Sequence, residues 1–578
     1  MVSLSLTREG PIWAKLVDFV RAQRWARGHR PVFWACTSIM VASFLLGGGT
    51  RAGFLSDVVL ELVAIPALLI SLSSLLELPR TQSKRRADWA LVFCLAIAVL
   101  PLIQLVPLPP WIWTRLPSRE GVAEVFDLLG DQRPWMPISV SPNATWLSLL
   151  SLLPPVAIFV SAIQLNFRER RKLTLVIVAV GVLSAFVGLI QVAQGTSSPL
   201  RFFAFTNNSE AVGFFANRNH FAALLYTVLL FAAAWAIDVA FKTGSWNNLK
   251  RYAATTLVTL TACFIVLIVL ISAATVARSR AGLLLTIIAL AAAFALVFAD
   301  RRNASGVTPS KLLIGAILLA ATLAVQFALY RILDRFAVDP IDDARIPFAH
   351  NTLRAAMAFM PFGSGLGTFV PVYEMFEPPS DALANIYANH AHNDLLELWL
   401  ETGVIGIALL GLFLIWFGFR SVNAWWRFPS QVSALDCSLV RAATIVIALL
   451  LVHSLVDYPL RTGAMMAIFA FSCAMLMEPL GNDEPTTSVG GEASREGASR
   501  KVLKPPTKAS AIPVALPALR PRTSREADNL PVPLRQSGER WGEDVDWPQE
   551  WSTIEPVSPG KPSIPAGEAR DPIDKEEE

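Results

Sequence analysis

Residues 395–419 read LLELWLETGVIGIALLGLFLIWFGF, and their only charged side chains are Glu397 and Glu401. A helix of this length crosses the roughly 30 Å hydrocarbon core of a bilayer. Similar apolar runs recur along the 578 residues, of which 54% are apolar and only 16% are charged. The mean hydropathy is +0.49, and a soluble chain would carry about 25% charged residues. The sequence therefore predicts an all-α integral membrane protein with many spans.

The same length criterion predicts about twelve spans. They centre on residues 31–49, 54–76, 88–107, 146–164, 173–193, 221–241, 254–277, 282–299, 312–330, 395–419, 442–457 and 463–479. Together they form a predicted membrane domain, 31–480. A basic segment, 1–30, precedes it and lacks the small-residue cleavage site of a signal peptide.

The residues after the last span have a different composition. Segment 481–578 is rich in proline and serine and ends in the acidic run IDKEEE, which is typical of a disordered tail. The five cysteines of the chain lie in or near apolar runs, and none forms a C-x-x-C pair. We therefore expect small buried apolar side chains there, and no disulfides or thiolate metal site.

Lysine and arginine are distributed unequally between the predicted loops. Basic runs such as RTQSKRRAD (80–88), FRERRK (167–172) and KTGSWNNLKR (242–251) fall in alternate loops, so those loops and the tail are predicted to be cytoplasmic. The opposite loops, the longest of which is 331–394, hold arginine but no lysine. Guanidinium groups bind phosphate bidentately, whereas lysine does not. These arginines therefore indicate a phosphate-binding face, or alternatively anchors for helix ends.

The predicted outer loops hold four of the six histidines: His220, His350, His390 and His392. Ionisable groups gathered at one membrane face indicate a functional site. HAHND (390–394) has the spacing of a metal site that His220 or His350 would complete, but the sequence supplies no clear further ligands. The other interpretation is structural. Asn393 or Asp394 would cap a helix whose first-turn acids include Glu397, and the histidines would bond the loop backbone.

Arginines accompany these histidines in the outer loops. Arg278 and Arg280 belong to ARSRAG (277–282), Arg345 lies in the longest loop, and Arg218 precedes His220. Two or three guanidinium groups can bind a lipid pyrophosphate and stabilise its charge as it leaves. A neutral histidine can accept the proton of an attacking hydroxyl group. We expect no metal or other cofactor if the guanidinium groups carry this charge.

Several motifs resemble those of the O-antigen ligase and O-antigen polymerase superfamily. They are SRAG (279–282), PFGSGLGTF (361–369) and HAHNDLLELWLETGVIG (390–406), in the same order of spans. NRNHFA (217–222) is most similar to the exopolysaccharide polymerase-type members. The resemblance extends over residues 30–480, and its core is 205–420.

This resemblance implies a GT-C-like, metal-independent, inverting glycosyltransferase in the bacterial inner membrane. Such enzymes take a glycan from undecaprenyl pyrophosphate on the periplasmic side. Polymerases of exopolysaccharide or O-antigen transfer it to the next lipid-linked repeat unit, and ligases of lipopolysaccharide biosynthesis transfer it to lipid A–core. NRNHFA and the glycine-rich loop favour a polymerase.

The resemblance also implies roles for individual residues. The catalytic histidine falls on His392, and the pyrophosphate-binding arginines fall on Arg280 and Arg345, with Arg278 and Arg218 as neighbours. Ala349 stands where tryptophan is usual, so Arg354 is a substitute for Arg345. The supporting residues are His220, His390, Asn393, Glu397 and Glu401. We expect the two glutamates to orient arginines or His392, because a carboxylate at the second ring nitrogen fixes the tautomer of a histidine.

Other interpretations use different features. A transporter of a small anion or of lipid-linked glycan would place its polar groups near the bilayer midplane, and a scaffold acting through the tail leaves the outer arginines unexplained. HSLVDYPLR (453–461) places His453 and Asp457 one turn apart, as a proton relay or, more simply, as a packing contact. The expected partners are the lipid-linked donor, a glycan or lipid acceptor and membrane lipid. A chain-length regulator or a kinase is a candidate partner of the tail, and no nucleic-acid partner is expected.

Overall fold

The computed structural model describes residues 30–50, 55–78, 81–242, 246–301, 340–382, 388–427 and 432–480. They all belong to one compact unit, Met1–Thr487, and the second unit is Ser488–Glu578. The predicted span 312–330, the predicted tail and all but the last residue of the predicted N-terminal segment lie outside the described residues. Within the described residues the structure is helical, with a single isolated β-bridge between Leu108 and Met136.

Among the residues that the structure describes, eight helical stretches are long and apolar enough to cross a membrane. They are α2 (Leu55–Glu77), α3 (Gln82–Gln104), the pair α6 (Pro142–Leu150) and α7 (Leu153–Gln164), α8 (Phe167–Gln194), α9 (Arg218–Lys242), α11 (Arg280–Arg301), α15 (Asp394–Trp426) and α16 (Ala434–His453). Three shorter apolar helices join them: Arg30–Leu46, the second half of α10 (Trp246–Ala277), and α17 (Gly463–Met475). Each predicted span that falls on described residues coincides with one of these helices, which confirms the all-α membrane class.

The boundaries of the predicted span 442–457 are wrong. The helix begins at Ala434, where Ser433 accepts a hydrogen bond from the backbone N–H of Asp436, and it ends at His453. Residues 454–457 form a turn, and Pro459 then starts the short 3-10 helix η1 (Pro459–Arg461). Because a proline restricts the residue before it to extended conformations, the helix cannot continue through this segment. Asp457 therefore lies beyond the helix.

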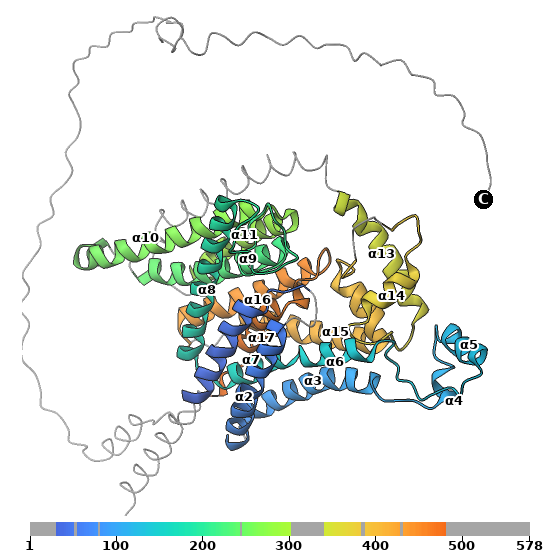
Figure 1. Cartoon of the computed structure of the whole chain (residues 1–578). Coiled ribbons are helices and arrows are strands. Elements are labelled where there is room, and N and C mark those ends of the chain that lie inside the picture. The colour runs from blue at the N-terminus through green and yellow to red at the C-terminus, as the bar shows by residue number, and fades with distance from the viewer. Residues whose placement is uncertain are drawn as a thin grey trace, which may run out of the picture. The chain divides into compact units, whose positions relative to one another are not determined.

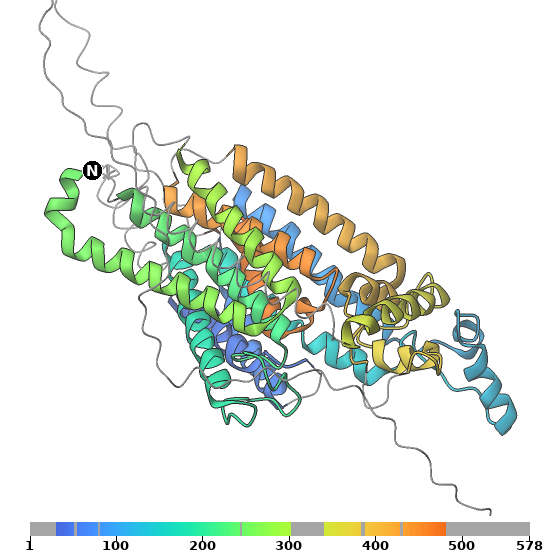
Figure 2. The same ribbon diagram turned by 90° about the horizontal axis from the view of Figure 1, so that it is seen from above.

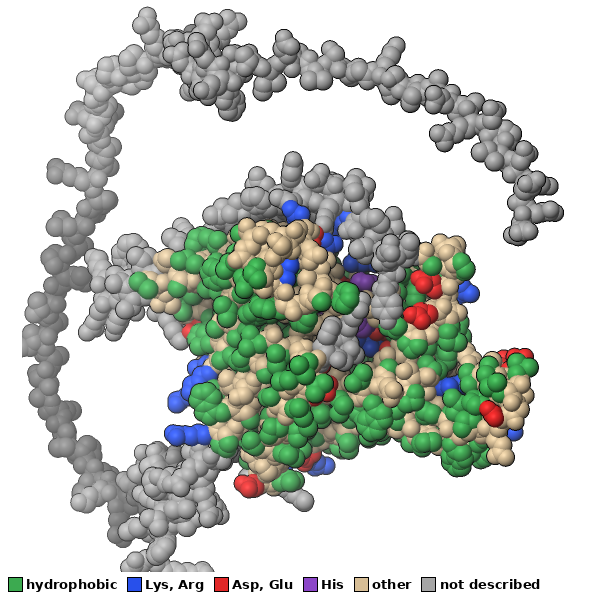
Figure 3. Space-filling model, viewed as in Figure 1, with side chains coloured by type: hydrophobic (Ala, Val, Ile, Leu, Met, Phe, Trp, Pro, Cys, Tyr) green, Lys and Arg blue, Asp and Glu red, His purple; other side chains and the backbone are tan. Residues whose placement is uncertain are grey.

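Helix α9 forms the centre of the bundle, and most of its residues are buried. It packs against α8, α10, α11 and α16 (Figures 1 and 2). By contrast, α2, α3 and α15 expose many apolar side chains, including Leu62, Leu69 and Ile415, and apolar atoms cover much of the visible face (Figure 3). Apolar surface on this scale is not found on soluble monomers and is that of helices facing lipid.

A second, smaller apolar cluster lies between α13 (Pro340–Ala358), α14 (Phe369–Phe376) and the first turns of α15. Helix α13 lies within the longest predicted loop, 331–394. The shorter helices α4 (Pro110–Trp113) and α5 (Glu120–Leu129) follow α3. Phe348 of α13 and Leu400 of α15 are both in the cluster, so the long loop is packed onto the helix that carries the predicted site.

The glycine-rich turn between α13 and α14 is bound to a break in α15. Gly403 has φ +59 inside the helix, and its backbone neighbour Val404 donates a hydrogen bond to Pro361 O at 3.0 Å. Gly363 has φ +77, and a Cβ atom there would lie 2.6 Å from Glu401 O. A side chain at either glycine would be strained and would collide with backbone. This contact fixes the loop to the N-terminal part of α15.

Candidate functional site

The N-terminus of α15 lies against the end of α16. Asn393 caps α15, because its side-chain oxygen accepts hydrogen bonds from Leu395 N at 3.0 Å and Leu396 N at 3.1 Å. Of the two predicted caps, Asn393 is therefore the correct one. Asp394 instead bonds Ser454, through its side chain at 2.7 Å and through its backbone N–H at 2.8 Å. We call this end of the bundle, where residues 389–401 meet 453–461, the histidine end.

His392 is paired with Asp457. Its Nδ1 lies 3.1 Å from Asp457 Oδ1, and the backbone of His392 has φ +50, a left-handed conformation that few non-glycine residues adopt. The imidazole stacks on Phe348, with ring centroids 6.1 Å apart. Its side chain is 15% exposed, and Nε2 has no hydrogen-bond partner among the described residues. The exposed nitrogen is therefore the one that a substrate can reach.

Asp457 is buried and accepts three hydrogen bonds. Besides His392, the Asn219 amide donates to Oδ2, and Tyr458 N donates to Oδ1 at 3.0 Å. Burial alone would raise the pKa of Asp457, but the hydrogen bond from His392 holds this pKa well below its usual range. The ionised carboxylate requires a proton on Nδ1 of His392, which leaves Nε2 as the basic nitrogen.

His390 has a different role, because both of its ring nitrogens are occupied. Nδ1 lies 2.8 Å from Glu397 Oε1, and Nε2 lies 3.1 Å from Thr50 O. A carbonyl oxygen accepts only, so Nε2 carries a proton. Burial opposes the charged form, but Glu397 raises the pKa of His390 above its ordinary value. His390 is therefore a partly buried side chain that has no free basic nitrogen.

Arg461 connects the acidic residues of this end. Its guanidinium lies 2.7 Å from Glu401, 3.4 Å from Glu397 and 3.5 Å from Asp394. Burial lowers the pKa of Arg461, but the three carboxylates raise it above its ordinary value. The expected role of the two glutamates thus needs correction in one respect. They bond an arginine and His390, whereas the carboxylate at His392 belongs to Asp457.

Tyr458 lies at the centre of the histidines. Its ring centroid is 4.1 Å from that of His390, 4.7 Å from that of His220 and 5.0 Å from that of His392. His220 is fully buried, and neither of its nitrogens has a hydrogen-bond partner in the part of the chain that the structure describes. In Figure 3, histidine atoms are visible in a recess of the surface with basic atoms beside them.

The SRAG segment brings an arginine to the start of α11. Ser279 caps this helix by accepting a hydrogen bond from Gly282 N at 3.0 Å. A Cβ atom at Gly282 would lie 2.3 Å from Ala222 Cβ, so α11 and α9 are in close contact here. Arg280 is the first residue of α11, where the positive helix end favours anions. Arg278, with φ +54, occupies the turn before it.

The remaining predicted arginines are in different environments. Arg218 pairs with Glu210 at 2.9 Å, so its charge is already matched. Arg345 is half-buried on α13, one turn before Phe348. Arg354 and His350 on the same helix are exposed. The geometry thus favours Arg345 over Arg354 as a member of the site.

The two histidines of HAHND are not arranged as a ligand pair. They bond different carboxylates, and the described residues contain no group of three or more His, Cys, Asp or Glu that could hold a metal ion. Three residues of the site were not predicted from the sequence: Asp457, Tyr458 and Arg461. All three belong to the motif HSLVDYPLR. Of its residues, only His453 fits the interpretation as a packing contact between helices, since its Nδ1 lies 3.2 Å from the Tyr226 hydroxyl.

Residues 263–411 match the family model described as O-Antigen ligase (Wzy_C), which supports the O-antigen ligase and polymerase superfamily. The matched range contains Arg280, Arg345 and His392, and it ends before Asp457 and Arg461. A search of the curated proteins finds no match.

Proposed function

We propose that this membrane protein, residues 263–411 of which match the O-antigen ligase family, is a glycosyltransferase of cell-surface polysaccharide biosynthesis. The donor is a glycan on undecaprenyl pyrophosphate, and the acceptor is a lipid-linked repeat unit, so the enzyme is a polymerase. The observation that carries the proposal is the Asp457–His392 pair, with its exposed Nε2 at the end of the bundle.

His392 acts as the general base of the reaction. Its Nε2 accepts the proton of the acceptor hydroxyl as the oxygen attacks the anomeric carbon, and Asp457 stabilises the imidazolium that forms. A base positioned in this way contributes about 10²–10⁴-fold to the rate. The bond between the anomeric carbon and the pyrophosphate oxygen breaks in the same step, so the configuration inverts.

Arg280 and Arg345 bind the leaving pyrophosphate. Its negative charge grows as the glycosidic bond breaks, and fixed cations in a water-poor site stabilise that charge most strongly at the transition state. The start of α11 adds its positive helix end to Arg280. The products are the extended glycan and undecaprenyl pyrophosphate, and these residues carry the reaction without a metal or other cofactor.

The buried network beneath His392 positions it. Asn219 of NRNHFA donates to Asp457, and Asn393 caps the helix that begins directly after His392. Arg461 and His390 neutralise the glutamates of the same helix end. We place this end on the periplasmic face of a bacterial inner membrane, with the C-terminal tail in the cytoplasm.

Two other functions are weighed against this one. A ligase that transfers the glycan to lipid A–core would use the same chemistry, and the description of the matching family model favours it. Transport of a small anion or of the lipid-linked glycan is less favoured, because the polar cluster described above lies at helix ends and the midspan is apolar.

The test is complementation of a deletion strain with the wild-type gene, His392→Ala or His350→Ala. His350 is an exposed histidine on α13 and serves as the matched control. The surface polysaccharide is sized on a gel, and the lipid-linked pool is analysed separately. A polymerase with His392 as base leaves only single repeat units in the deletion and in His392→Ala, and long polymer in His350→Ala. Long polymer that accumulates on the lipid carrier indicates a ligase. Full activity of His392→Ala would refute the site.

A further inference from the structure

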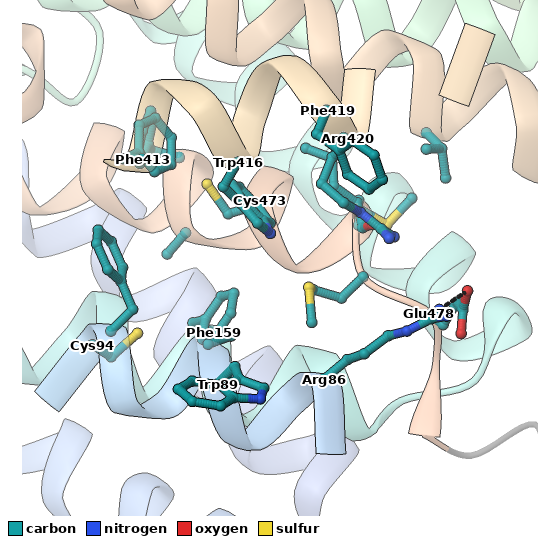
Figure 4. Close-up of a pocket in the computed structure, with 18 of the residues that line it drawn as sticks. Arg86, Trp89, Cys94, Phe159, Phe413, Trp416, Phe419, Arg420, Cys473 and Glu478 are labelled. Atoms are coloured by element: carbon teal, nitrogen blue, oxygen red, sulfur yellow. Dashed lines mark hydrogen bonds and ion pairs between the residues drawn. The ribbon is translucent and has the colours of Figure 1, made fainter. Parts of the chain in front are cut away.

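A cavity of about 1080 Å³ separates α3 from α15 (Figure 4), and its lining extends from Leu460 of η1 to Glu478. The two helices are joined at the histidine end, where the Gln104 side chain donates to Glu401 O at 2.8 Å and accepts from Leu366 N at 2.9 Å. Further along, α3 forms one wall, α15 forms the other, and α17 contributes to the lining between them.

The walls of this cavity are apolar and aromatic. Trp89 and Phe93 line it from α3, and Phe413, Trp416 and Phe419 line it from α15. Trp89 is 69% exposed and Phe419 61% exposed, so the cavity opens onto the surface that faces lipid. Such walls favour hydrocarbon chains, because the hydrocarbon core of a bilayer holds no water that could fill the cavity.

One end of the cavity is basic. Its lining includes Arg86, Arg420 and Arg427, and its only acid is Glu478. Glu478 pairs with Arg86 at 2.5 Å, as Figure 4 shows. Three arginines thus face one carboxylate among the described lining residues, which leaves this end with a net positive charge. Nη2 of Arg420 donates to Leu476 O. Nε of Arg420 is buried and lacks a hydrogen-bond partner among the residues that the structure describes.

We propose that this cavity binds a phospholipid with an anionic head group. The acyl chains lie along the aromatic walls, and the head-group phosphate contacts Arg420 and Arg427. The site is separate from the proposed reaction. Glu401 and Arg420 are 19 residues apart on α15, which corresponds to roughly 28 Å along a helix. A pyrophosphate at the histidine end therefore cannot reach the basic end.

The first experiment measures which lipids the purified full-length protein retains. Protein in mild detergent is mixed with dioleoyl phosphatidylglycerol or dioleoyl phosphatidylcholine and analysed by native mass spectrometry. Loss of the charge-assisted contacts should weaken phosphatidylglycerol binding about tenfold in Arg420→Gln/Arg427→Gln. Arg168→Gln is the matched control, because Arg168 is exposed at the first turn of α8 and outside the lining.

A second measurement does not depend on the arginine variant folding. Phosphatidylglycerol with brominated chains should quench the tryptophan fluorescence of the wild-type protein more than brominated phosphatidylcholine does, and Trp416→Phe should lose the excess. Equal retention of both lipids, with no effect of the arginine substitutions, would show ordinary contact with bulk lipid and overturn the proposal. A polyprenyl phosphate that displaces the phosphatidylglycerol would overturn it as well, since the cavity would then belong to the donor.

Discussion

Replacement of Asp457 by asparagine should remove most activity while the fold is retained. The amide has the shape of the carboxylate but no charge, and it can donate a hydrogen bond to Nδ1 of His392, which would move the proton to Nε2. Loss of one charge-assisted hydrogen bond, about 1.5–3 kcal/mol, sets a lower limit of roughly 10- to 150-fold on the rate. Complete loss of the base corresponds to about 10²–10⁴-fold. The structure places the expected effect between these limits, because the Asn219 amide can still donate to the remaining side-chain oxygen of residue 457, whereas the amide nitrogen that faces His392 can no longer accept from Tyr458 N.

The assay is the initial rate of glycan transfer in proteoliposomes. Asp394→Asn is the matched control, since Asp394 is a buried carboxylate of the same helix end that bonds Ser454 and Arg461 but not His392. A normal rate in Asp457→Asn, beside an inactive His392→Ala, would refute the pairing of His392 with Asp457.

Three further substitutions test the surroundings of the site. Gly403→Ala should destabilise the protein by about 1–3 kcal/mol, because φ is +59 and the new Cβ would lie 2.1 Å from Pro361 O. Thermal unfolding and proteolysis of the long loop measure this effect. Gly411→Ala is the control, because a Cβ atom at Gly411 would lie in open space. Arg461→Met leaves buried carboxylates without their cation and should cost about 3–5 kcal/mol in the same unfolding assay. The raised pKa of His390 means that its contribution to stability is complete below its ordinary value of 6.5 and is lost as the pH rises through the higher folded-state value. The melting temperature should therefore fall above pH 6.5 in the wild type and fall less in His390→Gln; parallel curves would contradict this assignment.

The sequence predicts the helices well because hydrophobicity over about 20 residues is a local property. The cap at Asn393 is likewise set by neighbouring residues. The partner of His392 is not local, since Asp457 is 65 positions away. The predicted span 442–457 also placed Asp457 inside a helix, whereas α16 ends before it. A pattern of residue types cannot indicate which of several acids a histidine contacts.

The left-handed backbone of His392 also has no sequence signal. His390 and His392 are two positions apart, and in a regular helix or strand this spacing alone would fix the angle between their side chains. With φ +50 at His392, one imidazole meets Glu397 and the other meets Asp457. Arg461 likewise has no sequence signal. The three carboxylates that it binds lie along one face of α15 because of the helical repeat. The spacing is visible in the sequence, but the arginine that it binds is not.

The difference between the two histidines of HAHND decides which of them can act as a base. A base needs a nitrogen that is unprotonated and reachable. His390 would have to give up its bond to Thr50 O and lose the proton that Glu397 stabilises, and both changes would leave buried polar groups unsatisfied. His392 needs neither change, because Asp457 holds the proton on Nδ1 and Nε2 faces the exposed side. His390 and His392 thus differ in function although each bonds a carboxylate. The second ring nitrogen of His390 is occupied, whereas that of His392 is free for substrate.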